Sequence, residues 1–119
     1  MATREEVRQR VGEDLGLVPI GQDLENQDQL RIDAGIDEAY AFLKQKNVAA
    51  FALEGDIPDD VMPHFALFVA FRLCLSYSIP DSRYVRIVAL AGPKGELALA
   101  KIAEVAVQEY DSTNDAHDF

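Results

Sequence analysis

Apolar side chains recur near the start of the chain at the spacing of an amphipathic helix. Val7, Val11 and Leu15 lie at four-residue steps and mark one face. Just before them, the segment TREE has the spacing of a capping box, with Thr3 as N-cap and Glu6 reaching back. This pattern predicts a short first helix.

The break GLVPIGQD at 16–23 separates this helix from a second one, which we expect at about 26–46. The second helix carries a single apolar stripe made of Ile32, Ile36, Ala39, Tyr40 and Leu43. Gly35 lies inside it and should weaken it by about 1 kcal/mol relative to alanine. A close crossing with another helix would explain a glycine there.

An extended link at about 48–58 follows, either a short strand or an extended arm. Asp59 or Asp60 suits the N-cap of a third helix. Pro63 then lies in the first turn, where its missing N–H costs nothing. We expect the third helix to run to about Ser78, where SIPDS ends it.

The third helix is apolar at every position from Phe65 to Phe71. A membrane-spanning helix needs about 20 mostly apolar residues, but only eleven positions separate Asp60 from Arg72. We therefore expect a central helix that is covered on nearly all faces. The predicted core consists of Phe65, Phe68, Phe71 and Leu75 from this helix, with Ile32, Ile36 and Leu43 from the second helix.

Two residues of the third helix need a separate account. Arg72 is costly there unless carboxylates or carbonyls receive it, so it either snorkels to the surface or forms a buried ion pair. The acid of such a pair would belong to the same subunit or to a neighbour. Cys74, the only cysteine, is expected to be a small buried hydrophobe, and a lone cysteine fits a reducing compartment.

The last third of the chain is expected to add one or two more helices. Residues 83–91 are rich in β-branched side chains and could form a strand, but we favour a helix capped by Asp81 or Ser82 because the rest is helical. AGPKG breaks it, and ELALAKIAEVAVQEY has a strong helical pattern. The predicted fold is an all-α bundle of four to five helices over 1–107, with an acidic tail at 108–119 that is mobile on its own.

Composition narrows the possible functions. Eleven basic and twenty-one acidic residues give a net charge of −10, which repels phosphate backbones but would allow DNA to slide past without sticking. His64 at a helix start and His117 in the tail have no evident partners for catalysis or metal binding, and no phosphate-binding loop or nucleophile set is present. We expect no cofactor, no metal, no enzymatic activity, no export signal and no membrane association.

The order of these segments resembles the head-to-tail adaptor proteins of tailed bacteriophages, also called head-completion or packaged-DNA-stabilisation proteins. The resemblance covers roughly 3–105 and rests on LGLVP, DAGIDEAYAFLKQKN, DDVMPHFALFVAFRLCLSYSIP and GELALAKIAEV in that order. The break at Pro93 and the short tail depart from longer members of that family.

This resemblance implies a structural protein in the neck of the virion, made in the host cytoplasm. Its subunits would form a ring, typically a dodecamer, below the portal protein. The ring would extend the DNA channel without binding DNA specifically and would dock a stopper or tail-completion protein. We expect the tail to dock onto the portal or a neighbouring subunit through Tyr110, Asp111, Asp115, Asp118 and Phe119.

One competing interpretation remains open at this stage. The chain could be an acidic cytoplasmic interaction or regulatory protein that mimics nucleic acid and blocks a basic partner. Such a protein would be a monomer or dimer and would have no portal partner.

Overall fold

The computed structural model, which describes residues 2–46, 51, 53, 57–74, 77 and 79–104, contains helices and no strand within those residues. The named helices are α1 (Arg4–Asp14), α2 (Asn26–Gln45), α3 (Met62–Leu73) and α4 (Asp81–Ala91). Residues 96–104 are helical as well. The prediction of a small all-α bundle is confirmed, and so is the helical assignment of 83–91.

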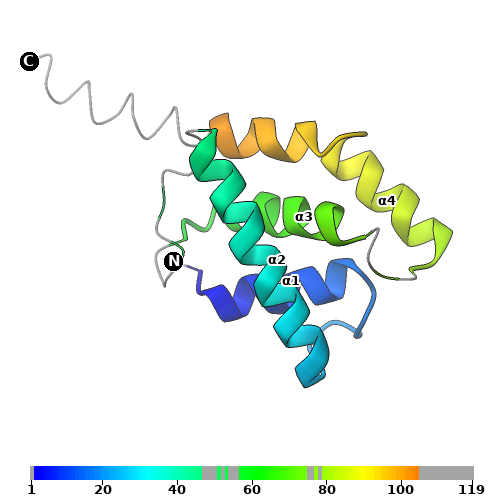
Figure 1. Ribbon diagram of the computed structural model, residues 1–119. Coiled ribbons are helices and arrows are strands. Elements are labelled where there is room, and N and C mark those ends of the chain that lie inside the picture. Colours follow the sequence, from blue (N-terminus) through cyan, green and yellow to red (C-terminus); the bar gives the residue numbers. More distant parts are fainter. Residues whose placement is uncertain are drawn as a thin grey trace, which may run out of the picture.

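Helix α3 occupies the centre of the bundle (Figure 1). α1, α2 and α4 all pack against it, and residues 96–104 contribute the buried side chains of Ala98 and Ile102 to the same core. Arg72 is the one residue of α3 in the exposed class, and the others are buried or partly buried. The apolar helix is therefore covered by its own chain, and its burial requires no neighbouring subunit.

The predicted core residues lie largely where the apolar stripes place them. Phe65, Phe68, Ile32, Ile36 and Leu43 are all buried. Phe71 is only partly buried and packs at the edge of the core, and Leu75 lies outside the described residues. The face of α1 formed by Val7, Val11 and Leu15 is also buried, because it packs on α3.

Helix α1 begins as its sequence predicts. The Thr3 side chain accepts a hydrogen bond from the Glu6 backbone N–H at 3.2 Å. The Thr3 hydroxyl also donates to the Glu6 carboxylate at 3.5 Å. Ala2 precedes the helix and pairs with Ile57 in an isolated antiparallel bridge. Ile57 lies near the end of the predicted link at 48–58.

Two predicted helix starts and one predicted end are wrong. α3 begins after Val61 rather than after Asp59 or Asp60, because the chain first turns at Pro58, whose carbonyl accepts the Val61 and Met62 N–H groups at 3.0 Å each. Pro80, not Asp81 or Ser82, is the N-cap residue of α4. Its carbonyl accepts the Arg83 and Tyr84 N–H groups, so helical bonding has already started there.

The C-terminal end of α3 lies at Leu73, earlier than the predicted Ser78. Cys74 still donates its N–H to the Ala70 carbonyl at 2.9 Å. Residues 75, 76 and 78 lie outside the described residues.

Gly35 marks the close crossing of α2 and α3 that the sequence suggests. A Cβ at this position would meet the Leu73 Cδ1 and Cδ2 atoms at 2.8 and 2.9 Å. Glycine therefore lets the backbone of α2 lie directly against a side chain at the end of α3, where a larger residue would push the two helices apart.

Candidate functional site

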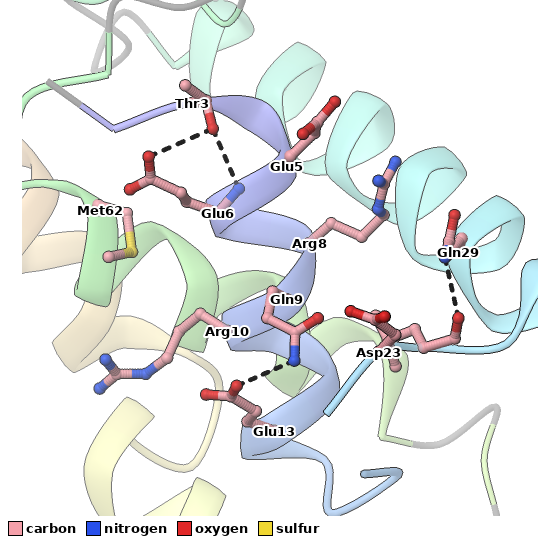
Figure 2. Close-up of a pocket in the computed structure, with 11 residues that line it drawn as sticks. Thr3, Glu5, Glu6, Arg8, Gln9, Arg10, Glu13, Asp23, Gln29 and Met62 are labelled. Atoms are coloured by element: carbon pink, nitrogen blue, oxygen red, sulfur yellow. Dashed lines mark hydrogen bonds between the residues drawn. The ribbon is translucent and has the colours of Figure 1, made fainter. Parts of the chain in front are cut away.

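Two hollows lie beside α1, and the first is a polar groove. Its lining residues are Thr3, Glu5, Glu6, Arg8, Gln9, Arg10, Glu13, Asp23, Leu24, Gln29 and Met62 (Figure 2). Several of these side chains bond within the chain: Gln9 donates to Glu13 at 3.0 Å, and Gln29 donates to the Leu24 carbonyl at 2.9 Å. Across the part of the chain that the structure describes, no group of three His, Cys, Asp or Glu side chains could hold a metal ion.

The second hollow, which we name the arginine cleft, encloses about 650 Å³. It lies where the end of α1, the segment 18–20, the start of α3 and the length of α4 meet. Its lining residues are Arg10, Glu13, Asp14, Val18, Pro19, Ile20, Pro63, His64, Leu67, Arg83, Arg86, Ile87 and Leu90. Three arginines thus gather around an apolar floor, in a chain whose net charge is −10.

The arginines of the cleft differ in their partners. Arg10 Nε lies 3.3 Å from Asp14 Oδ1, one helical turn further on, and Figure 2 shows its side chain turned away from α2. Arg83 packs against the turn after α1, since a Cβ on Gly16 would lie 3.1 Å from Arg83 Nε. Neither Arg83 nor Arg86 forms an ion pair with a described carboxylate.

The two acids of the cleft are already engaged inside the chain. Glu13 Oε2 accepts hydrogen bonds from Gln9 Nε2 at 3.0 Å and from the Gly21 N–H at 3.1 Å. Burial raises the pKa of the Asp14 carboxyl, while the guanidinium groups of Arg10 and, more weakly, Arg86 lower it. The arginine cleft therefore offers positive charge that its own acids leave partly uncompensated.

A second set of ion pairs holds α1 to α2. Arg8 Nη1 lies 3.0 Å from Asp33 Oδ2, and Arg4 Nη2 lies 2.8 Å from Asp37 Oδ1. Arg4 also donates to the Asp33 backbone carbonyl at 3.1 Å. Because these side chains are partly exposed, such pairs orient the helices more than they stabilise them.

Of the two alternatives predicted for Arg72, the structure shows the side chain that snorkels to the surface and not the buried ion pair. Arg72 is exposed, and its guanidinium lies over the rings of Phe42 and Phe68, with 5.2 and 5.8 Å from Cζ to the ring centroids. The long side chain starts from an exposed position of α3, so it reaches solvent and gains a cation–π contact instead of a carboxylate.

Some of the remaining predicted residues lie in the described structure and others lie outside it. Cys74 is buried as expected, and its thiol donates to the Phe71 carbonyl at 2.9 Å. His64 lines the arginine cleft beside Pro63. The predicted docking residues Tyr110, Asp111, Asp115, Asp118 and Phe119 lie outside the described residues, as do His117 and the boundary at 107–108.

Sequence reasoning missed the arginine cleft. Its only local signal is Arg83 and Arg86, one helical turn apart on α4 beside Leu90. The contribution of Arg10 depends on packing α4 near α1, and these helices are far apart in the sequence.

No helix among the described residues has the length and hydropathy needed to cross a bilayer. The chain matches no protein-family model, no curated protein and no solved structure.

Proposed function

We propose that this chain is a structural head-to-tail adaptor of a tailed bacteriophage, forming a ring below the portal that extends the DNA channel and docks the next tail component. The observation that carries the proposal is the order of elements. The sequence resemblance rests on a short helix, a long amphipathic helix, a link, and a central apolar helix followed by further helices. The structure has helices in this order.

The charge of the chain supports the same role. DNA carries one negative charge per roughly 1.7 Å of duplex, so a channel lined by basic groups would hold it by releasing counterions. A subunit with twenty-one acidic and eleven basic residues has more groups that repel phosphates than groups that hold them. A ring of these subunits would let DNA pass without trapping it.

Assembly of the ring does not depend on covering the apolar faces of α3, because the other helices already cover most of them within one chain. Large apolar side chains that remain exposed on the described surface are Ile20, Leu30, Tyr84, Val85, Leu90 and Leu97. Four of these lie on α4 or just after it. A closed ring needs two different complementary surfaces on each subunit, and the outward side of α4 is a candidate for one of them.

The test is whether this chain binds purified rings of the portal protein encoded near its own gene. We expect the chain to co-migrate with portal rings in size-exclusion chromatography and to form a coaxial ring in electron micrographs. A chain truncated after Val107 should bind less well at low salt. This difference should shrink at high salt, because charges at an interface rim are screened.

Two outcomes would contradict parts of the proposal. Equal binding by the full and truncated chains would remove the tail from docking and leave the helical body as the docking surface. A chain that stays monomeric or dimeric and never binds a portal would overturn the adaptor role and favour the acidic regulatory protein.

A further inference from the structure

The arginine cleft combines guanidinium groups with apolar side chains. Arg83 and Arg86 have no ion-pair partner among the described residues. Of the other charged groups that face them, Arg10 is paired with Asp14, and Glu13 accepts two hydrogen bonds within its own segment. An incoming carboxylate would therefore meet guanidinium groups that no described acid holds in an ion pair, although the Asp14 carboxylate already attracts Arg86 at longer range.

The apolar side of the cleft is equally open. Ile20 is 88% exposed and Leu90 is 54% exposed, although both line the hollow. Isolated apolar residues on a surface need no explanation, but these two flank a concave site that also contains Val18 and Leu67. An aromatic ring placed there would remove this apolar surface from water, which is favourable.

The chain itself contains a segment with this chemistry. Residues 105–119 hold four acids, Glu109, Asp111, Asp115 and Asp118, and no lysine or arginine. They also hold two aromatic residues, Tyr110 and Phe119. We propose that the C-terminal segment 105–119 docks into the arginine cleft of its own chain, placing its carboxylates on Arg83 and Arg86 and an aromatic ring against Ile20 and Leu90.

The segment 105–119 is long enough to make this contact within its own chain. In Figure 1 the helical segment 96–104 runs back along α3, from the end of α3 toward its start. Pro63 and His64, at the start of α3, line the cleft. An extended chain of fifteen residues spans up to about 50 Å. A short tether also gives the segment an effective concentration on the order of millimolar at the cleft, so modest contacts suffice.

Docking of this kind would make the cleft and the tail hide one another in the free protein. A partner that binds either of them would have to displace the other first. The contact needs no portal and no ring, so it stands or falls separately from the adaptor role.

Paramagnetic NMR on the full chain tests the contact. A nitroxide is attached at Ser112→Cys, and Cys74 stays in place because it is buried and because burial raises the pKa of its thiol. The ¹⁵N-labelled, spin-labelled chain is diluted into excess unlabelled wild-type chain. We expect the backbone signals of Ile20 and Leu90 to lose intensity relative to the reduced nitroxide, while Leu30 on α2 keeps its intensity.

Charge variants separate the cleft from other basic surfaces. Arg83→Glu combined with Arg86→Glu should restore the Ile20 and Leu90 signals. Lys44→Glu combined with Lys46→Glu, which changes the same charge on α2, should leave the signal loss in place. Should the arginine variant fail to fold, Asp111→Asn, Asp115→Asn and Asp118→Asn together should restore the signals without altering the cleft.

Three results would overturn the proposal. One is the absence of signal loss at Ile20 and Leu90. A second is loss that the lysine variant removes and the arginine variant does not. The third is loss that appears only when ¹⁵N-labelled chains are mixed with separate spin-labelled chains, since the occupant would then be the tail of a second copy.

Discussion

Asp14, in the wall of the arginine cleft, should give the stability of the fold an unusual pH dependence. Burial raises the pKa of its carboxyl above the ordinary value of 3.8, against the lowering effect of Arg10. The folded state therefore binds the Asp14 proton more tightly than the unfolded state does. This contribution to stability is full below the unfolded pKa of about 3.9 and is lost as pH rises through the raised folded pKa.

The variant Asp14→Asn isolates that contribution, because it removes the titrating group. We expect the free energy of unfolding of the wild type, minus that of the variant, to fall as pH rises from about 4 toward neutrality. Urea unfolding followed by circular dichroism across this pH range measures the difference. A difference that stays constant, or that grows with pH, would show that the Arg10 pair outweighs burial.

At the scale of helices, the position of α3 dictates which side chains the fold depends on. Phe65 is fully buried in the middle of the bundle, so Phe65→Ala should lower the free energy of unfolding by about 3–5 kcal/mol. Leu30→Ala on α2 is the matched control, because Leu30 is 71% exposed and should change stability by no more than about 0.5 kcal/mol. Urea denaturation of both variants checks the contrast, and similar losses would be inconsistent with a core centred on α3.

The crossing of α2 and α3 sets helix propensity against packing at Gly35. Alanine is the better helix former by about 1 kcal/mol, but its Cβ would overlap the Leu73 methyl groups, and overpacking typically costs about 1–3 kcal/mol. Gly35→Ala should therefore be neutral to destabilising in the wild type and stabilising in a Leu73→Ala background. Thermal unfolding of the wild type, the two single variants and the double variant completes this double-mutant cycle. An equal effect of Gly35→Ala in both backgrounds would rule out the close contact.

Much of this arrangement could be predicted from spacing, and the rest could not for physical reasons. The stripes containing Val7, Ile36 and Phe65 specify the buried faces because a helix repeats its faces every 3.6 residues. The start of α3 was missed because the turn at Pro58 replaces a side-chain cap by backbone bonds. The surroundings of Arg72 and of Arg83 depend on contacts between distant helices, which local patterns do not encode.

Across the whole molecule, charge leads to a prediction about DNA. With a net charge of −10 the chain should not retard duplex DNA in a gel at low salt, where non-specific binding is strongest. The arginine cleft is the surface that could violate this expectation. A gel shift of the DNA that disappears with added salt, and also in the Arg83→Glu and Arg86→Glu double variant, would identify the cleft as a DNA contact. Such a result would contradict the docking of the acidic tail in the cleft.

The central place of α3 also governs the order in which the protein can be completed during synthesis. α1 and α2 are synthesised before the helix on which both pack. At about 5–20 residues per second, the interval between finishing α2 at Gln45 and finishing α3 at Leu73 is about 1–6 s. During that interval the apolar faces around Val11 and Ile36 lack α3, the helix on which both pack in the folded chain, so the core cannot close until α3 has been added.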